Sequence, residues 1–422
     1  MKKIVFLASV LVLFSTIMIV RLIRPVEASG TIYIKADGSV SPSTAKISSF
    51  DNVTYTFTDN NYDSFVVQID NIVVDGAGYT LQGKGVSYSK GIDLTGRRNV
   101  TIRNMEIRKF FFGIWLKTSS NNTIFGNNIN LNKVGIWLSD SSCNTISGNN
   151  VTANMDYNIY LEYSSSNSIL GNSIAAHKVW VSYLYYSFFG IYLYHSSSNS
   201  ISGNNVTNSD YGIQISLSSN NNTIFGNSIR NNTYGILIWK SSTNTIYGND
   251  AIGNDYGIVL TKSSKNTIYH DNFMNNTKQA YSHNSTNFWD DGYPSGGNYW
   301  SNYKDRYPDA EEMDESGIWD TPYVIDESNQ DNYPLTNSWI PEQEALPLAA
   351  EEVPLWMQLW LWATVAVGIL VLAGAFYFFL KKKTVKTSSI LTAIALLVCL
   401  VLGSLSNSLV RLRVKIDLYG NI

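Results

Sequence analysis

The chain has 422 residues and a formal net charge of −3, from 30 Lys and Arg against 33 Asp and Glu. A surface this close to neutral gives no support for binding nucleic acid, which requires a strongly basic patch. Only 15% of the residues are charged, well below the ~25% that is usual in soluble domains. Cys143 and Cys399 lie far apart in the sequence, so neither a disulfide framework nor a zinc-binding set of cysteines is expected.

Residues 1–28 have the layout of a secretory signal. Two lysines precede an uncharged run from Ile4 to Val20, and Val26-Glu27-Ala28 follows at the positions that a signal peptidase reads. Because the apolar run is long and two arginines follow it, an uncleaved signal anchor is the alternative. Either segment would export the rest of the chain.

Residues 31–90 contain short strand-like runs, and residues 91–286 contain a repeat of 22–23 residues with one longer interval of 32. Each unit has two short runs, G-I-x-L and N-T-I-x-G-N, in which apolar and polar residues alternate as they do in strands. Strands this short are unstable alone, so they must pair with the equivalent strands of neighbouring units. The repeat therefore predicts an all-β, right-handed parallel β-helix, with residues 31–90 as its N-terminal cap and first coils.

Three columns of aliphatic residues are predicted to point into the β-helix, because alternation along a strand places every second side chain on one face. The first column is Ile114, Ile136, Ile159, Ile191, Ile213, Ile236 and Ile258. The second is Leu116, Leu138, Leu161, Leu193, Ile215, Ile238 and Leu260. The third is Ile102, Ile124, Ile146, Ile169, Ile201, Ile224, Ile246 and Ile268.

An asparagine precedes each N-T-I strand and is predicted to form a structural ladder. A stacked amide can donate and accept hydrogen bonds along the axis, which satisfies bend backbone that has no partner in a sheet. This function is structural, so no catalytic role is assigned to the column. Its members are Asn99, Asn122, Asn144, Asn167, Asn199, Asn222, Asn244 and Asn266.

Asp156, Asp210 and Asp255 recur in the D-Y-[GN] step before a new coil and are the candidate catalytic residues. Two coils separate each from the next, which is about 9–10 Å at sheet spacing and close to the carboxylate separation of inverting glycosidases. An aspartate that caps bend backbone would give the same pattern. No Lys or Arg is identified in a matching column, which a lyase base would require.

The outward position of G-I-x-L is aromatic in four successive coils, at Trp115, Trp137, Tyr160 and Tyr192. Beside these rings, the 32-residue interval inserts an aromatic segment that includes Trp180 and Tyr183. Exposed aromatic surface of this extent indicates an interaction site, and flat rings suit stacking against sugars. The alternative is that the insertion folds over the four rings and buries them.

Residues 287–339 break the repeat and are predicted to form a C-terminal cap. Ten acidic residues lie between Asp305 and Asp331, which leaves a structural calcium site open, although the cap has no D-x-D-x-D-G loop. Residues 340–354 form a short acidic linker. Residues 355–380 are predicted to be a transmembrane helix. Residues 388–410 are a second apolar stretch, so the sequence is compatible with either one or two transmembrane spans.

The coil pattern GIxL…NTIxGN, the segment VVDGAGYTLQGKG and the caps WDDGYPSGGNYWSNY and WDTPYVIDESNQDNYPL together resemble the NosD-type β-helix repeat family. That family belongs to the broader CASH group of carbohydrate-binding and sugar-hydrolase β-helices. The resemblance covers about residues 31–335 and implies a right-handed β-helix outside the membrane. Membrane-anchored versions are similar to surface proteins of archaea.

The name-giving members of that family are associated with copper-site maturation of an exported reductase, but this sequence predicts no cofactor. Its four histidines, His177, His195, His270 and His283, are scattered and form no H-x-H pair, whereas copper needs converging ligands. A copper role is therefore not expected to carry over.

Three functional hypotheses follow for an exported protein anchored in a membrane, with the β-helix on the extracytoplasmic side. The leading one is non-catalytic binding of glycans or other envelope components through the aromatic face. The second is a polysaccharide hydrolase or lyase that uses the aspartate column. The third is a NosD-like accessory factor for an exported metalloenzyme.

Overall fold

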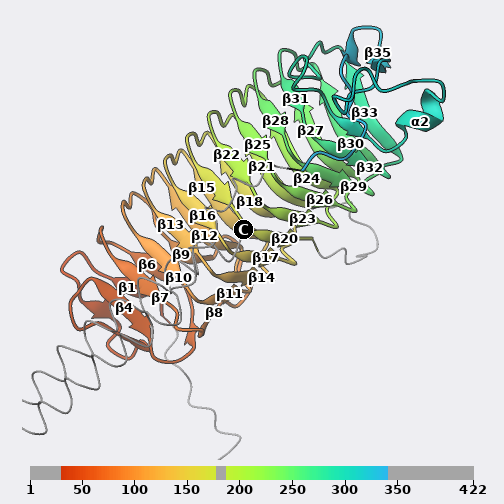
Figure 1. Ribbon diagram of the computed structural model, residues 1–422. Coiled ribbons are helices and arrows are strands. Elements are labelled where there is room, and N and C mark those ends of the chain that lie inside the picture. The colour runs from red at the N-terminus through yellow and green to blue at the C-terminus, as the bar shows by residue number, and fades with distance from the viewer. Residues whose placement is uncertain (1–29, 177–186, 341–422) are drawn as a thin grey trace, which may run out of the picture. The chain divides into compact units, whose positions relative to one another are not determined.

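The computed structural model describes residues 30–176 and 187–340 of the chain. Over these residues the strands of successive coils lie side by side along one axis, from the first coils in red to the C-terminal cap in blue (Figure 1). The prediction of an all-β parallel β-helix is confirmed. Each coil contributes strands to three sheets, however, and not only to the two that the alternating runs predicted.

The first sheet, sheet A, contains the G-I-x-L strands and has the order β2-β1-β6-β9-β12-β15-β18-β21-β24-β27-β30-β33. All its pairings are parallel except that of β1 with β2. Its strands are β1 (Ile32–Ile34), β2 (Val40–Ser41), β6 (Phe65–Val67), β9 (Lys90–Asp93), β12 (Phe112–Lys117), β15 (Val134–Ser139), β18 (Tyr157–Glu162), β21 (Phe189–Tyr194), β24 (Tyr211–Ser216), β27 (Tyr234–Trp239), β30 (Tyr256–Thr261) and β33 (Lys278–His283).

Sheet B contains the N-T-I strands, and sheet C contains the strand that follows in each coil. Sheet B comprises β3 (Ile47–Ser48), β4 (Thr54–Phe57), β7 (Val73–Asp75), β10 (Thr101–Arg103), β13 (Thr123–Phe125), β16 (Thr145–Ser147), β19 (Ser168–Leu170), β22 (Ser200–Ser202), β25 (Thr223–Phe225), β28 (Thr245–Tyr247) and β31 (Thr267–Tyr269). Sheet C comprises β5 (Asn61–Tyr62), β8 (Thr80–Gln82), β11 (Glu106–Arg108), β14 (Asn128–Asn130), β17 (Asn150–Thr152), β20 (Ser173–Ala175), β23 (Asn205–Thr207), β26 (Ser228–Arg230), β29 (Asp250–Ile252), β32 (Asn272–Met274) and β34 (Tyr299–Trp300).

Four columns of aliphatic side chains fill the interior. Every residue of the three predicted inward columns is completely buried. Sheet C supplies the fourth column, whose members are equally buried: Ile107, Ile129, Val151, Ile174, Val206, Ile229, Ala251 and Phe273. Because each column faces the others across a narrow interior, the apolar burial that stabilises one coil depends on the coils above and below it.

Stacked asparagines at the bend before sheet B form a hydrogen-bonded ladder. The Oδ1 atom of Asn144, for example, accepts hydrogen bonds from both the backbone N–H and the Nδ2 of Asn122, each at 3.0 Å. The same contact joins Asn122, Asn144, Asn167, Asn199, Asn222, Asn244, Asn266 and Asn287, and the ladder ends at Asn329.

The prediction for Asn99 was wrong by one position. Val100 occupies the ladder position of that coil, and its N–H donates to Asn122 Oδ1 at 3.0 Å. Asn99 precedes it with a left-handed φ of 55° and donates instead to Asn71 Oδ1 at 2.9 Å. The error arose because this coil has an apolar residue where the later coils have asparagine.

A second asparagine ladder, which the sequence analysis missed, runs along the bend between sheets B and C. It joins Asn127, Asn149, Asn172, Asn204, Asn227 and Asn249, continues through Asp271 and Asn298, and ends at Asp331. Strand β36 (Asn329–Asp331) pairs antiparallel with β35 (Tyr323–Asp326). This one strand therefore terminates both ladders, through its first and last residues.

The C-terminal cap closes the end of the apolar interior with aromatic rings. Trp300 is almost completely buried and stacks on Phe273, the last residue of the fourth inward column, with ring centroids 4.7 Å apart. Tyr323 stacks on the Trp300 ring with centroids 4.1 Å apart, and Tyr303 of the short helix α2 (Tyr303–Arg306) is also buried. The predicted cap segment thus covers the end of the core.

Among residues 30–176 and 187–340, no helix is long and apolar enough to cross a membrane. The predicted signal segment, the linker from residue 341 onward and both predicted transmembrane segments lie outside the described residues.

Asn204 provides a test of the second ladder. Replacement by alanine removes the acceptor of two hydrogen bonds from Asn172 and the donor to Ile169 O. Since buried polar groups left without partners cost about 1–3 kcal/mol each, Asn204→Ala should lower the urea midpoint clearly, by the equivalent of about 2 kcal/mol or more. The neighbouring exposed Asn205→Ala should change it little; equal effects of the two substitutions would argue against the ladder.

Asp271 makes the same ladder sensitive to pH. It is completely enclosed, one oxygen accepts two hydrogen bonds from Asn249, and Oδ2 has no partner among the described residues. Burial raises the pKa of Asp271 to about 8 from an ordinary value of 3.8. Because the folded pKa exceeds the unfolded one, stability is fully present below about pH 4 and is lost as pH rises towards 8.

Asp271→Asn should therefore raise the melting temperature at pH 9 and reduce the loss of stability between pH 5 and pH 9. The amide restores the donor that the ionised carboxylate lacks, an effect of about 1–3 kcal/mol. Thermal unfolding followed by circular dichroism at both pH values measures this, with the exposed Asp309→Asn as control. An unchanged pH dependence in the Asp271 variant would contradict the account.

Candidate functional site

The outward face of sheet A carries a column of aromatic rings in four neighbouring coils. Trp115, Trp137, Tyr160 and Tyr192 lie in register on β12, β15, β18 and β21. Their consecutive ring centroids are 4.7, 5.1 and 5.2 Å apart. The structure thus brings these four predicted residues together. Trp180 and Tyr183 of the insertion lie outside the described residues.

A second aromatic column, which the sequence analysis missed, runs beside the first. It consists of Phe112, Tyr157, Phe189, Tyr211, Tyr234 and Tyr256, interrupted by Val134. Phe112 contacts Trp115 at 4.6 Å between ring centroids, and Tyr157 contacts Tyr160 at 4.8 Å, so the two columns share one face. We name the combined set of rings on sheet A the aromatic face.

The second column was missed because glycine interrupts the alternation of the strand. Counting by twos from Ile114 places residue 112 inside, yet the Phe112 ring packs against the outward rings of Trp115 and Trp137, and a Cβ at Gly113 would meet the interior Ile129 Cγ2. A Cβ at Gly113 would stand 2.5 Å from the carbonyl oxygen of Gly135, so only glycine permits this close approach of neighbouring coils. The sequence did contain a signal. In these coils an aromatic residue directly precedes the glycine that begins the G-I-x-L run, or precedes Asn158 where asparagine replaces that glycine.

The N-terminal half of the aromatic face borders a groove of about 470 Å³, which we name the aromatic groove. Its lining combines the rings with the charged side chains of Lys90, Lys133 and Asp156. Lys90 Nζ lies 2.7 Å from Asp93 Oδ2 and 4.9 Å from the centre of the Trp115 ring. The groove is therefore mainly apolar, with a few polar groups along its edge, as in ordinary ligand sites.

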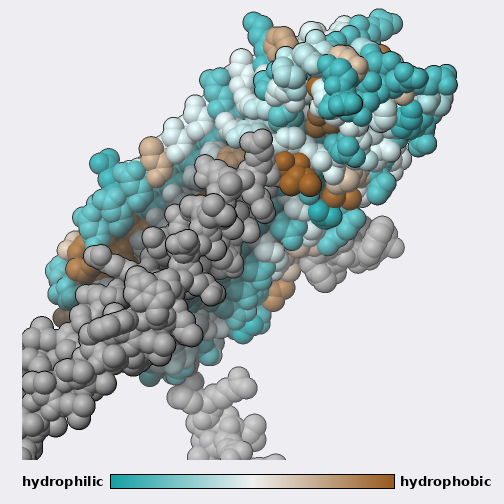
Figure 2. Space-filling view, viewed as in Figure 1, coloured by the Kyte–Doolittle hydropathy of each residue, from teal (hydrophilic) through white to brown (hydrophobic). Residues whose placement is uncertain are grey.

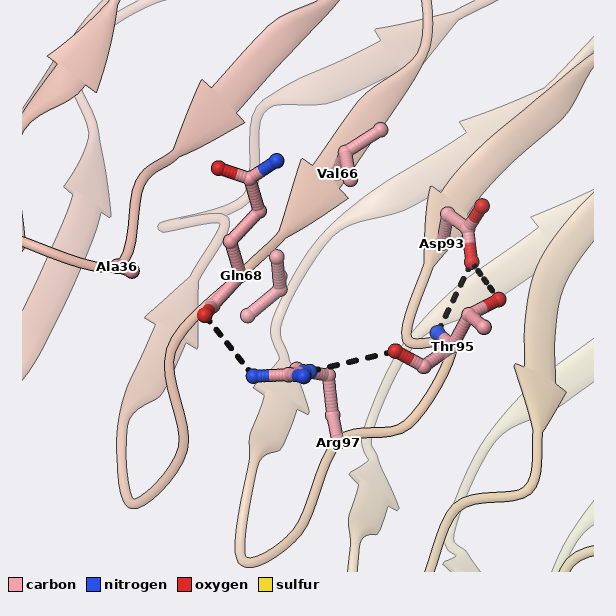
Figure 3. Close-up of a pocket in the computed structure, with 7 residues that line it drawn as sticks. Ala36, Val66, Gln68, Asp93, Thr95 and Arg97 are labelled. Carbon is pink, nitrogen blue, oxygen red and sulfur yellow. Dashed lines mark hydrogen bonds between the residues drawn. The ribbon is translucent and has the colours of Figure 1, made fainter.

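Beyond Asp93, the same face of sheet A becomes polar. A pocket of about 370 Å³ lies between Val66, Asp93 and Arg97 (Figure 3). The Arg97 guanidinium reaches across it and donates to the backbone carbonyl of Gln68 at 2.9 Å, while Asp93 accepts from Thr95. These polar groups satisfy one another, so the pocket is less suited to a ligand than the aromatic groove.

At the C-terminal half of the face, a second groove of about 310 Å³ is lined by Tyr211, Tyr234, Tyr256 and Trp239, with Gln214 as its polar group. Elsewhere on the side shown in Figure 2, the described surface is largely hydrophilic, with scattered apolar patches. Sheet A therefore carries the two ring-lined grooves, although a shorter ring stack of Phe225, Tyr247 and Tyr269 lies on sheet B.

Buried polar atoms without partners occur in both grooves. Among the described residues, Trp115 Nε1, Asp156 Oδ1 and Gln214 Oε1 have no hydrogen-bond partner although each atom is out of contact with solvent. One is a donor and two are acceptors. Leaving such groups unpaired costs about 1–3 kcal/mol each, and because they are out of contact with solvent, a ligand could pair with them only if neighbouring side chains moved.

Two carboxyl groups flank the aromatic face: Glu162 at the end of β18 and Asp156 just before β18 begins. Burial raises the pKa of Asp156 above its usual value, against the opposing effect of the nearby Lys133 ammonium. Burial and the charge of Asp140 raise the pKa of Glu162, which lies beside Trp137 and Tyr160. Both carboxyls therefore hold a proton more readily than exposed acids do.

The three candidate catalytic aspartates occupy one column, in alternate coils. Phe188 stands between Asp156 and Asp210, and Thr233 stands between Asp210 and Asp255. The backbone N–H of Phe188 donates to Asp210 Oδ2 at 3.0 Å, and Asp255 is exposed on the surface. The column thus includes an aspartate that caps backbone, and only Asp156 lines the aromatic groove.

The expectation that no lysine shares this column was wrong. Lys133 occupies, in the preceding coil, the position equivalent to that of Asp156. The backbone N–H of Asp156 donates to the carbonyl oxygen of Lys133. Their side chains form an ion pair of 3.4 Å. The sequence signal was present, because Lys133 stands two residues before Gly135 as Asp156 stands two before Asn158.

The described residues do not fit a copper site. They contain no group of three or more His, Cys, Asp or Glu side chains placed to hold a metal ion, and this applies also to the acids of the C-terminal cap. His195 stacks on Tyr163, His270 contacts Ser295 O and stacks on Trp339, and His283 lies beside Asn284. Each of these three imidazoles therefore has a separate structural environment. His177 lies outside the described residues.

A family model described as "Periplasmic copper-binding protein (NosD)" matches residues 50–234 and 181–305, which together exceed half of the chain. No curated protein sequence is significantly similar to the chain.

Solved structures with a similar fold include the enzymatically active domain of bacteriophage CBA120 tailspike protein 2, with 16% identity and a TM-score of 0.40, covering 54% of this chain and 43% of that one. A mutant of the periplasmic alginate epimerase AlgG has 17% identity and a TM-score of 0.38, covering 54% and 61%. An alginate lyase from Paenibacillus sp. has 14% identity and a TM-score of 0.39, covering 57% and 90%. The chain thus spans less than two thirds of the tailspike domain and the epimerase.

Proposed function

Because the chain belongs to the NosD family of parallel β-helix proteins, we propose that it is a binding protein whose ligand is a glycan lying along the aromatic face. The observation that carries this proposal is the combination of aromatic rings and polar side chains in one groove, namely Trp115 and Trp137 with Lys133 and Asp156. A glycan offers both matching chemistries: C–H groups on the faces of its rings and hydroxyl groups around their edges.

The rings supply the apolar part of the contact. Trp115, Trp137 and Tyr160 follow one another at coil spacing, with the plane of Trp137 at 70° to that of Trp115 and at 36° to that of Tyr160, so a glycan along the groove would meet both faces and edges of rings. The negative π-face of an aromatic ring attracts the weakly positive C–H groups of a sugar. Because the backbone ladders fix the spacing of the rings, little side-chain freedom is lost on binding.

The polar atoms favour a glycan over a purely apolar partner. An aliphatic helix or a lipid chain placed over this groove would cover the Lys133 ammonium and the Asp156 carboxyl group without offering them hydrogen bonds, which is unfavourable. Sugar hydroxyls can both donate and accept, so they can hydrogen-bond to these charged groups at the groove lining. The same hydroxyl chemistry suits Gln214 in the second groove.

The proposal places the β-helix outside the cytoplasm. The family description names the periplasm, and residues 1–28 have the layout of an export signal. Residues 355–380 would then hold the β-helix at the membrane surface. The copper-binding part of the family description is not carried over, since the described residues offer no converging donors.

Trp137→Ala tests the proposal. We expect the full-length protein to bind a subset of an oligosaccharide array, and the alanine variant to lose about 10- to 100-fold in affinity, the equivalent of ~1.4–2.8 kcal/mol. The matched control is Phe125→Ala, which removes an exposed ring from sheet B and should bind as the unsubstituted protein does. Binding that survives in the Trp137 variant but fails in the Phe125 variant would refute the assignment of this face.

A further inference from the structure

A third groove, of about 680 Å³, adjoins the aromatic groove at the bend between sheets C and A. Phe111 and Lys133 line both grooves, so the two form one continuous surface. The bend groove starts in the loop after β8, at Gln82–Gly85, and continues to Met155 three coils later. It lacks the ring stacks of the aromatic face and is more polar.

The joined grooves concentrate positive charge. Lys84, Lys109 and Lys133 line the bend groove, and Lys90 lines the aromatic groove; against these four lysines, Asp156 is the one acidic residue in either lining. The whole chain has a net charge of −3, so this local excess runs opposite to the overall balance. A low-dielectric groove with one sign of charge concentrates ligands of the opposite sign.

Lys90 is held by Asp93, with its Nζ 2.7 Å from Asp93 Oδ2, whereas the three lysines of the bend groove are held less tightly. Lys109 is exposed and forms no ion pair with a described residue. The Lys84 side chain is 58% exposed although it pairs with Asp63 at 3.0 Å. The Lys133–Asp156 distance of 3.4 Å is longer than the ~2.7–2.9 Å of a strong charge-assisted hydrogen bond, so Lys133 can still bind an anion.

We infer that the glycan is an acidic polysaccharide, whose sugar rings stack on Trp115 and Trp137 while its anionic groups bind Lys109 and Lys133. This inference rests on the proposed function and adds the charge of the ligand to it. Lys133 stands at the junction, with its Nζ 4.9 Å from the centre of the Phe111 ring and beside Asp156. Asp156 then acts as a competitor, because its carboxylate neutralises Lys133 when no ligand is bound.

The test compares matched charged and neutral ligands. Full-length protein is titrated with polygalacturonate and with hyaluronan, each beside its carboxyl-reduced form, which keeps the ring but removes the charge. We expect at least one acidic polymer to bind tenfold or more tightly than its reduced form, and this preference to shrink as salt rises and screens the lysines.

Three variants locate the charge recognition. Lys109→Gln should weaken binding of the acidic polymer several-fold and leave the reduced form unaffected. Asp156→Asn should strengthen binding of the acidic polymer, because the competing charge is gone; a merely structural role of Asp156 would weaken both ligands alike. Lys262→Gln, an exposed lysine at a distant bend, is the control and should change neither.

The outcomes separate the two claims. If acidic and reduced polymers bind equally and Lys109→Gln changes neither, the inference of an anionic ligand is overturned while the glycan proposal stands. If neither polymer binds in any form and the oligosaccharide array gives no hit that Trp137→Ala removes, the proposed function fails and the inference fails with it.

Discussion

Hydrogen bonds between stacked side chains at the bends hold each coil in register with the next, and the position of every outward residue depends on that register. In the asparagine ladders before sheets B and C, and in shorter asparagine stacks before sheet A, one Oδ1 accepts from the backbone N–H and from the amide of the preceding coil. The bend backbone, which has no partner in a sheet, is satisfied in this way inside the molecule. A column of serines, including Ser141, Ser164 and Ser196, does the same after sheet A.

This register explains how the fold separates stability from function. The inward columns and the ladders fix the backbone, so outward positions on sheet A are free to vary in chemistry from coil to coil. In one column the chain has Asp93, then aromatic residues in four coils, then Gln214. The aromatic face, its lysines and its unsatisfied atoms lie in the part of the repeat that the core does not constrain.

The sequence predicts the features that repeat with a simple period. The three inward columns and one asparagine ladder were predictable because alternation and coil length fix them. Sheet C was not separated from the end of the N-T-I-x-G-N run, although the second asparagine of that run marks the bend. Phe112 and its equivalents were missed because the strand does not alternate strictly at the glycine that follows them, a position where neighbouring coils approach too closely for a side chain. The position of Lys133 in the aspartate column was missed because that column was traced only from its first aspartate, Asp156, and Lys133 lies one coil earlier.

The candidate site also shows what only coordinates can supply. That Trp115 Nε1 and Asp156 Oδ1 lack partners follows from the packing of several coils and has no counterpart in any single repeat. The ring columns and the groove they line make the N-terminal half of sheet A the candidate binding surface.

Hydroxyl-radical footprinting of the full-length protein, with and without the glycan that it binds most tightly, tests this assignment most directly. The account predicts that oxidation of Trp115, Trp137 and Tyr160 slows when the glycan is bound, while Phe125 and Tyr247 on sheet B react at unchanged rates. Protection confined to sheet B, or equal protection of both sheets, would contradict it.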